Sequence, residues 1–410
     1  WICSGQSNME WPLTRTLNST HEIADAEFPD IRLFKLVRNA IGKPQDNCQG
    51  SWSLCNPQAA KTFSAVAYFF GKHLHRDTGK PIGLIQSTWG GTPVEGWTSQ
   101  EALAKVKVAK PILERWALQR SSYTKNQTIY LSQLSKWETA NQKAEKGGGQ
   151  VPSRPRAPSN PTTRPHHPGS LFNGMIYPLI PYSIRGAIWY QGESNVTRAH
   201  QYRSLFPAMI HDWRNRWGLG DFPFLFVQIA PFRYGRNPPE MCPELQEAQM
   251  MTFRNVPNTG MVVTTDIGNI RDIHPRNKHD VGRRLALWAL HDTYGRKDLQ
   301  PSGPVFKSHR VEGNTVLLEF DYHAGGLTSL DGEPLSHFTI AGEDRAFRHA
   351  EVVKIVNGTS ISVSSRQIAK PVAVRFGWRD DAQPNLGNKV RLPASPFRTD
   401  KWSGKTDRNK

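Results

Sequence analysis

The sequence is poor in several features that would place the chain in a narrow class. No pair among its four cysteines has the C-x-x-C spacing of a zinc site. No apolar run approaches the roughly 20 residues that a transmembrane helix needs, so we expect no membrane span. No internal repeat at the periods of solenoids or propellers is present. These absences argue against a C-x-x-C zinc site, a transmembrane helix and a repeat array. The four cysteines are Cys3, Cys48, Cys55 and Cys242.

The cysteines and the first residues bear on the compartment of the protein. Cys48 and Cys55 flank Gly50 and Trp52, and in an oxidising compartment they would close a small loop. Buried free thiols explain the cysteines equally well, because four of them in a chain of this length define no disulfide framework. The chain opens at Trp1, inside what reads as a strand, so we expect that a signal segment preceded it and that the protein is secreted or periplasmic.

Acidic residues are scarce relative to basic ones. Lys and Arg number 52 against 35 Asp and Glu, which gives a formal net charge of +17. Residues 101–170 alone hold 12 Lys and Arg and only 4 Asp and Glu. No RNP-like, zinc-finger or helix-turn-helix pattern accompanies this excess, so we expect no nucleic-acid partner. A solvated basic face explains the charge, and attachment to an anionic glycan or surface is the functional alternative.

Short apolar runs alternate with helical periods through the first 300 residues. Hydrophobic residues make up 37% of the chain and include 13 Trp, which is enough for a sizeable packed core. The alternation predicts βαβ units and a mostly parallel sheet, in which the chemistry lies at the carboxyl ends of strands. The predicted strands are 31–35, 82–86, 186–189, 224–228 and 261–266, and the predicted helices are 65–75, 202–217 and 280–294.

Two other patterns define an insertion and a second domain. Residues 101–142 read as helix, and the Gly-, Pro- and Arg-rich stretch 147–168 predicts a long irregular loop. Beyond residue 300, alternating runs separated by Gly and Asn turns predict a small all-β sandwich, with strands at 315–320, 360–363 and 372–376. We therefore expect an α/β domain over residues 1–300, interrupted at about 101–170, and an all-β domain over 301–410.

A serine follows directly on the first apolar run, in Gly5-Gln6-Ser7-Asn8-Met9. At a strand-to-helix turn the Ser7 hydroxyl is exposed, and the neighbouring amides can stabilise a developing oxyanion. Taken alone, this motif is more typical of a helix N-cap than of a nucleophile.

The second motif is a late Asp/His segment, Asp272-Ile273-His274. A serine hydroxyl becomes a nucleophile when a base takes its proton, and histidine has a suitable pKa. That histidine needs an acid to fix its tautomer, and Asp272 lies on the same side of an extended segment as His274. An isolated D-x-H is more often a loop histidine without a catalytic role.

Two further polar segments follow predicted strands. In residues 86–97, Gly90 and Gly91 let a backbone amide approach a substrate closely. In residues 189–195, Gln191 can donate a side-chain hydrogen bond to the same oxyanion. Aromatic rings beside the motifs could stack on a sugar or simply fill the core. Our candidate substrate-binding residues are Trp89, Trp97, Tyr190 and Asn195, with Trp11 as a further aromatic candidate.

The four motifs occur in an order, each at a predicted strand end, that resembles the sialate O-acetylesterase branch of the SGNH hydrolases. The segments that carry the resemblance are G-Q-S-N-M, G-L-I-Q-S-T-W-G-G-T-P-V-E-G-W, W-Y-Q-G-E-S-N and D-I-H-P-R-N-K-H-D-V-G-R-R-L-A. The resemblance spans residues 1 to about 294, and residues 385–399 are similar to the family's closing β segment. It implies a three-layer α/β/α, flavodoxin-like esterase core that needs no metal or organic cofactor.

Carried over residue by residue, the resemblance implies catalytic roles for four residues. Ser7 matches the nucleophile and His274 the catalytic histidine. Gly91 and Gln191 match the oxyanion-hole blocks, joined by the Ser7 amide.

The acid of the predicted triad stays open among three carboxylates. Asp272 departs from the D-x-x-H spacing of many SGNH hydrolases, in which the acid would fall at Arg271. Glu193 belongs to a Q-G-E segment that replaces their G-x-N-D block, and related acetylesterases share this form. Asp266, at the end of its predicted strand, is the weakest of the three.

The resemblance implies removal of O-acetyl groups from a carbohydrate, with sialic acid as the sugar, through an acetyl-serine intermediate. An acetylxylan or pectin-side-chain acetylesterase is the alternative within the esterases. A non-catalytic glycan-binding protein and a polyanion-binding protein are the alternatives outside them, and they predict binding without acetate release. Arg271 and Arg276 could attract a carboxylate-bearing sugar, although surface solvation explains them as well.

Overall fold

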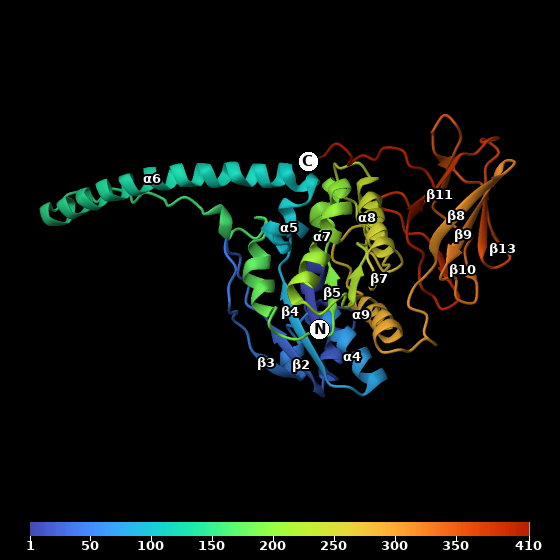
Figure 1. Ribbon diagram of the computed structural model, residues 1–410, viewed down its shortest axis with the longest axis horizontal. Coiled ribbons are helices and arrows are strands. Elements are labelled where there is room, and N and C mark those ends of the chain that lie inside the picture. The colour runs from blue at the N-terminus through green and yellow to red at the C-terminus, as the bar shows by residue number, and fades with distance from the viewer. Residues whose placement is uncertain (410) are drawn as a thin grey trace.

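Seven strands form the central sheet of the protein (Figure 1). The computed structural model describes residues 1–409, and the sheet order is β3-β2-β4-β1-β5-β6-β7. Every neighbouring pair is parallel except β2 with β3. The part β4-β1-β5-β6-β7 has the 2-1-3-4-5 order of flavodoxin-like sheets, and β2 and β3 extend one edge. The strands are β1 Ile2–Gly5, β2 Phe28–Lys35, β3 Trp52–Cys55, β4 Ile82–Thr88, β5 Ala187–Tyr190, β6 Phe224–Val227 and β7 Thr259–Val262.

Helices cover both faces of this sheet, because successive strand residues point to opposite sides. Ile2 and Trp189 belong to the apolar core under helices α7 and α8, whereas Cys3 and Ile188 belong to the core under α4 and α9. The fold is therefore the predicted three-layer α/β/α arrangement. The helices are α1 Ser7–Glu10, α2 Ser19–Ala24, α3 Pro57–Ala60, α4 Ala65–Thr78, α5 Gln100–Ala104, α7 Ala199–Trp217, α8 Met241–Asn255 and α9 Lys278–Trp288.

The insertion forms an arm that projects from the body of the molecule (Figure 1). Helix α6, Lys110–Gly147, has 38 residues, and only Ile112 among them is buried. The helix predicted over residues 101–142 is confirmed with one correction, since it is broken between α5 and α6. Pro111 lies at the start of α6 and has no amide hydrogen to donate, so it is tolerated in the first turn of a new helix and not within a continuous one.

Residues 148–168, the return segment of the arm, run back along α6 and cover a stripe of aromatic side chains. Trp116, Tyr123, Tyr130 and Trp137 are seven residues apart, so they lie on one face of the helix, and all four are half-buried. In the return segment, Pro152, Pro155, Pro158 and Pro161 recur every three residues, the period of a polyproline II helix. The indole of Trp137 donates a hydrogen bond to the carbonyl of Pro152 at 2.7 Å. The predicted irregular segment is thus held against the helix.

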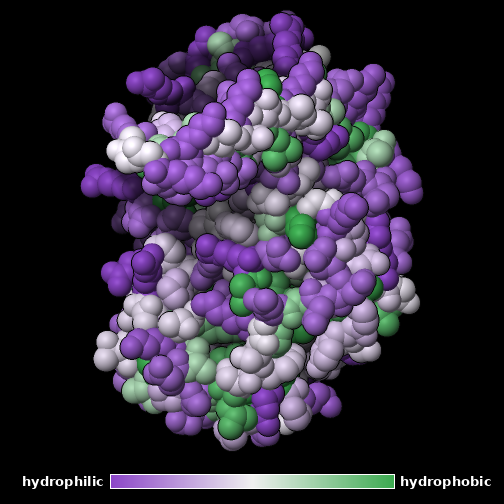
Figure 2. Space-filling view, turned by 90° about the vertical axis from the view of Figure 1, so that its left-hand side faces the viewer, coloured by the Kyte–Doolittle hydropathy of each residue, from purple (hydrophilic) through white to green (hydrophobic). Residues whose placement is uncertain are grey.

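The surface seen from the side of the arm is mostly hydrophilic, with hydrophobic residues in small groups (Figure 2). The exposed aliphatic side chains of α6 are Leu118, Ile129 and Leu131. They are separated by polar and basic positions, so they form no continuous apolar face.

Antiparallel strands make up the C-terminal region, as predicted. The sheets β12-β11-β15-β17 and β13-β14-β9-β8 share one apolar core, and β10 pairs with β16. The tail then returns to α8, where Arg398 binds Glu247 at 2.7 Å. The strands are β8 Val305–Glu312, β9 Thr315–Asp321, β10 Leu327–Ser329, β11 Phe338–Ala341, β12 Arg348–His349, β13 Val352–Val356, β14 Ser360–Ser364, β15 Ala373–Phe376, β16 Leu386–Asn388 and β17 Phe397–Arg398.

Three expectations need comment. The strand predicted over 261–266 is wrong at its end, since β7 stops at Val262 and Asp266 lies in a turn. All four cysteines are free thiols, so Cys48 and Cys55 form no disulfide in this structure. The domain boundary near residue 300 stays a prediction.

Within residues 1–409, no helix combines the length and the apolar character needed to cross a bilayer.

Candidate active site

Ser7 begins helix α1 directly after strand β1, at the carboxyl edge of the sheet. Gly5 makes this turn possible. Its φ is +139°, and a Cβ atom there would lie 2.2 Å from the carbonyl oxygen of Tyr190. Only a residue without a side chain lets β1 pair this closely with the end of β5 before the chain turns into α1.

His274 meets Ser7 across this edge. Its Nε2 atom lies 2.8 Å from Ser7 Oγ, within hydrogen-bonding distance, although 267 positions separate the two residues. The indole of Trp11 stacks on the imidazole, with ring centroids 4.8 Å apart and planes 16° from parallel. The structure therefore brings together the two residues that the sequence motifs singled out as nucleophile and base, and it holds the imidazole plane in place.

Asp272 lies on the other side of the imidazole. Its Oδ1 accepts a hydrogen bond from the His274 backbone amide at 2.9 Å and lies 3.8 Å from Nδ1. Burial, together with Lys278 and Arg15, lowers the pKa of His274 below its ordinary value, and Asp272 opposes this shift. The imidazole is therefore neutral at neutral pH, as a general base must be.

The other two candidate acids bind elsewhere. Glu193 accepts a hydrogen bond from Asn8 Nδ2 at 2.6 Å, its second oxygen is enclosed without a hydrogen-bond partner, and burial raises its pKa. Asp266 forms a two-point ion pair with Arg284, at 2.7 and 2.5 Å. Of the three carboxylates, Asp272 is the one placed against the imidazole.

A buried polar network underneath the Ser7–His274 pair was not anticipated from the sequence. Asn8 Nδ2 also donates to the carbonyl of Ile273 at 2.9 Å, and Lys278 Nζ donates to Asn8 Oδ1 at 2.5 Å. Burial lowers the pKa of Lys278 to about 7, while Glu193 opposes that shift. The network joins α1 to the loop that carries the histidine. Its sequence signal is slight: Asn8 follows the serine, and Lys278 comes four residues after His274.

The loop after β4 supplies the predicted glycine pair. The Gly90 amide donates to Glu10 Oε2 at 2.9 Å, and a Cβ atom at Gly90 would lie 3.2 Å from the Cβ of Ser7. Gly91 has a φ of +74°, and no atom lies within 4 Å of the position where its Cβ would be. One face of Gly91 is therefore open, and Gly91 follows directly on the glycine that packs against Ser7.

Gln191 requires a correction. Its side chain is completely buried, and its amide nitrogen donates to Thr92 O at 3.2 Å and to Asn195 Oδ1 at 2.7 Å. Both amide hydrogens are used within the protein, so the predicted side-chain donation from Gln191 to an oxyanion is wrong for this arrangement. Gln191 instead links the end of β5 to the loop after β4.

Three of the four predicted sugar-binding residues are also corrected. Trp97, Tyr190 and Asn195 have at most 1% of their surface exposed. The Asn195 side chain is held by Val94, Gln191 and Glu95. A side chain without accessible surface offers nothing for a sugar to contact, so these residues belong to the core. The rings of Trp11 and Trp89 remain partly exposed.

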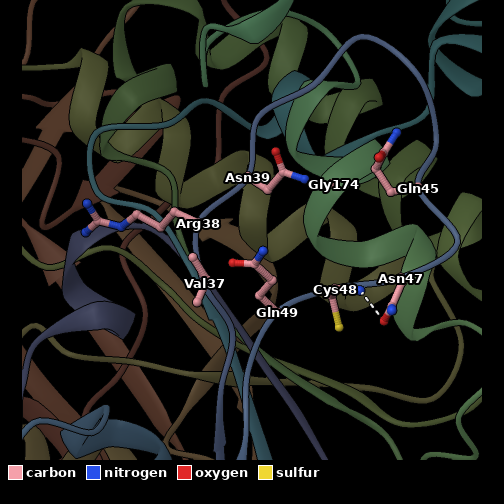
Figure 3. A pocket seen from close by; sticks show the side chains of 8 residues that line it. All are labelled: Val37, Arg38, Asn39, Gln45, Asn47, Cys48, Gln49 and Gly174. Atoms are coloured by element: carbon pink, nitrogen blue, oxygen red, sulfur yellow. Dashed lines mark hydrogen bonds between the residues drawn. The ribbon is translucent and has the colours of Figure 1, made fainter.

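A cavity of about 390 Å³ is lined by residues of the segment 37–49 and by Gly174 (Figure 3). Arg38 borders one end and Asn47 the other. Two of its polar side chains already have partners, since Gln45 donates to Lys43 O and Asn47 accepts from the Cys48 amide. Within residues 1–409 no group of three or more His, Cys, Asp or Glu side chains is placed to hold a metal ion.

Known proteins resemble this chain in sequence and in structure. A sequence model described as carbohydrate esterase, sialic acid-specific acetylesterase matches residues 171–290, which include His274. The human sialate O-acetylesterase is 30% identical over 430 aligned positions, which cover 97% of this chain and 74% of that protein. The chain belongs to the sialate O-acetylesterase family.

Two further relatives and one solved structure extend the comparison. The rat and mouse sialate O-acetylesterases are each 31% identical over 351 positions, which cover 78% of this chain. The chain matches about three fifths of the length of these two relatives, 61% in each case. The crystal structure of a carbohydrate acetylesterase from Xanthomonas citri superposes with a TM-score of 0.79 at 36% identity, covering 98% of this chain and 80% of that one.

Proposed function

We propose that this family member is a serine esterase that removes O-acetyl groups from carbohydrates, with acetylated sialic acid as substrate. The observation that carries the proposal is the 2.8 Å contact between Ser7 Oγ and His274 Nε2 at the carboxyl edge of the sheet. The relatives named as sialate O-acetylesterases support the choice of sugar.

In the first half-reaction, His274 takes the proton of the Ser7 hydroxyl as Oγ attacks the acetyl carbonyl. Asp272 faces Nδ1, so it favours the tautomer that carries its proton there and leaves Nε2 free to accept. The 3.8 Å separation is longer than a hydrogen bond, and catalytic hydrogen bonds often shorten when substrate is bound.

The tetrahedral oxyanion needs donors that point at it before the reaction begins. With the Gln191 side chain occupied, we assign this role to the backbone amides of Ser7 and Gly91. The Ser7 amide belongs to the first turn of α1, where helical amides have no partner within the helix. The open face of Gly91 allows the acetyl group to come close.

The sugar alcohol leaves after taking the proton from the imidazolium of His274. Water, deprotonated by the same imidazole, then attacks the acetyl-serine and releases acetate and the free Ser7 hydroxyl. Asn8, Glu193 and Lys278 touch no reacting atom in this scheme. They position the His274 loop against α1.

The test is release of acetate from p-nitrophenyl acetate and from O-acetylated sialic acid. Ser7→Ala should lower kcat by about 10³-fold or more while the circular dichroism spectrum is retained. The matched control is Ser122→Ala, an exposed serine on α6, which should behave as the wild type. Retained turnover in Ser7→Ala would refute the serine mechanism. Acetylated xylan and pectin fragments assayed in parallel test the alternative substrates, and sugar binding without any acetate release would favour a non-catalytic glycan-binding protein.

A further inference from the structure

The cavity of about 390 Å³ lined by residues 37–49 and Gly174 lies at the edge of the sheet that carries Ser7. We call it the amide cavity. Its first residues follow the carboxyl end of β2, and β2 is parallel to β4 as β4 is to β1, so the three strands end at the same edge. Neighbouring strands are about 4.8 Å apart, which separates the ends of β2 and β1 by roughly 10 Å. One extended sugar unit spans such a distance.

A series of contacts joins Ser7 to the wall of the amide cavity. Gly90 packs on Ser7, and its amide donates to Glu10 at 2.9 Å. Glu10 also forms an ion pair with Arg38, whose guanidinium lies 5.4 Å from the centroid of the Trp89 ring. Arg38 borders the cavity. A glycan whose acetyl group is at Ser7 therefore has the amide cavity within reach of its neighbouring sugar.

The loop that forms the amide cavity is held in place by the segment that contains Gly174. The backbone amide of Gln45 donates to the carbonyl of Asn173 at 3.0 Å, and the side chain of Asn173 donates to the carbonyl of Ile41 at 3.1 Å. A Cβ atom at Gly174 would lie 2.1 Å from the carbonyl oxygen of Asn39, so the two backbones pack closely. A ligand binds such a preformed site without the cost of ordering the loop.

Carboxamides are the commonest side chains in the lining. They belong to Asn39, Gln45, Asn47 and Gln49. Each carboxamide both donates and accepts, as the hydroxyl groups of a sugar do. The one charged residue of the lining, Arg38, is already paired with Glu10. The lining therefore suits an uncharged ligand that is rich in hydroxyl groups.

Two of the four carboxamides are available to such a ligand. Gln45 donates to the carbonyls of Lys43 and Pro44, and Asn47 accepts from the Cys48 amide. The side chains of Asn39 and Gln49 are exposed and make no hydrogen bond within residues 1–409. Figure 3 shows both of them between Arg38 on one side and Cys48 on the other.

We propose that the amide cavity binds the neutral sugar to which the acetylated sugar of the substrate is glycosidically joined, and that Asn39 and Gln49 hydrogen-bond its hydroxyl groups. This inference rests on the proposed function. It makes the preferred substrate an O-acetylated sialic acid at the end of a glycan, and the free monosaccharide a poorer one.

The first experiment compares O-acetylated sialyllactose with free O-acetylated sialic acid. In the wild type, kcat/KM should be about tenfold higher for the sialyllactose, because its lactose part adds hydrogen bonds. Asn39→Ala and Gln49→Ala should each lower this ratio by about threefold, and the double variant should bring it close to one. The matched control is Gln133→Ala, which removes an exposed carboxamide from α6 and should leave the ratio as in the wild type.

The outcomes separate this inference from the proposed function. A wild-type ratio near one, or a raised ratio that persists in the double variant, would overturn the inference. Hydrolysis of p-nitrophenyl acetate but of neither sialic acid substrate would instead overturn the choice of sugar in the proposed function.

Cys48 gives a readout without turnover. It borders the amide cavity and is half-buried, whereas the other three cysteines are buried. N-ethylmaleimide should therefore label the native protein first at Cys48, although burial raises the pKa of its thiol and slows the reaction. Lactose should slow this labelling, followed by mass spectrometry, in the wild type and not in the double variant. Labelling that ignores lactose, or that lactose slows equally in both proteins, would overturn the inference even if Ser7→Ala is inactive.

Discussion

Asp272 Oδ1 faces Nδ1 of His274 across 3.8 Å, while Nε2 of the same ring faces Ser7. Glu193 instead accepts a hydrogen bond from Asn8 Nδ2 at 2.6 Å. The two carboxylates that compete for the role of triad acid therefore differ in a way that kinetics can separate.

Asp272→Asn should lower kcat/KM on p-nitrophenyl acetate by about 10²- to 10⁴-fold, because the imidazolium loses its charge partner. Glu193→Gln should lower it by less than about tenfold, since the amide oxygen can still accept from Asn8. Steady-state kinetics on both variants decides the matter. The reverse ranking would make Glu193 the acid.

The pH dependence follows from the direction of the His274 shift. Because burial, Lys278 and Arg15 lower its pKa, the neutral base persists to lower pH, and the acidic limb of kcat/KM should lie below the ordinary histidine pKa of about 6.5. Asp272 opposes that shift, so the residual activity of Asp272→Asn should have its acidic limb at still lower pH. A limb that moves upward in this variant would contradict the assignment.

Lys278 should make the stability of the fold depend on pH. Its pKa is about 7 in the folded chain, against about 10.4 in an unfolded one. Between these values the unfolded state binds more protons, so the free energy of unfolding rises with pH through this range. Urea unfolding of wild type and Lys278→Met at pH 7 and pH 9 isolates the contribution. The wild type should gain stability relative to the variant at the higher pH, and a flat difference would mean that Lys278 is not desolvated.

Gly5 should tolerate no side chain. Gly5→Ala would place a methyl group 2.2 Å from Tyr190 O, and we expect a loss of about 3 kcal/mol in the free energy of unfolding, with a comparable loss of activity because Ser7 is two residues away. Gly79→Ala is the matched control. Its φ is also positive, at +65°, but no atom lies within 4 Å of the new methyl group, so only about 1 kcal/mol should be lost. Equal effects in denaturant unfolding would show that the contact with Tyr190 is unimportant.

The arm should open locally without affecting the core. Trp137→Ala removes the hydrogen bond to Pro152 and the contact with Arg154, so amide exchange should accelerate in residues 150–156. The melting temperature of the body should stay within about 1 °C, since Trp137 belongs to α6, which projects from the body (Figure 1). Lys136→Ala, at the neighbouring exposed position, serves as control. Exchange that is equally slow in both variants would show that the aromatic stripe does not hold the return segment.

The spacing of apolar residues along the chain predicts most of its strands and helices. Fully buried strands such as Phe224–Val227 read as apolar runs, and the amphipathic period of Ala65–Thr78 marks its helix, because both patterns report burial on one or two faces. The same spacing does not fix where each strand ends. Val262 ends its strand although Val263 continues the apolar run, since strand ends depend on which neighbour is present to pair.

Some residues of the candidate site could be found from the sequence, and others only from the structure. Ser7 and His274 were singled out by the order of the four motifs and by the family resemblance, because each motif taken alone has a commoner structural explanation. The partners of Gln191, Asn8 and Glu193 could not be identified, since each lies on a different element and a hydrogen bond depends on a separation of about 3 Å that no spacing in the chain encodes.

The sequence by itself determined the alternation of strands and helices, the all-β character of the C-terminal region, and the residue types of the proposed nucleophile and base. Only the tertiary structure decided that Asp272 faces the imidazole, that Gln191 is occupied, and that Gly174 borders the cavity formed by residues 37–49. The physical reason is the range of the interactions involved. Burial patterns are local and recur along the chain, whereas contacts between groups that are a hundred or more residues apart depend on the packing of the entire sheet and its insertion.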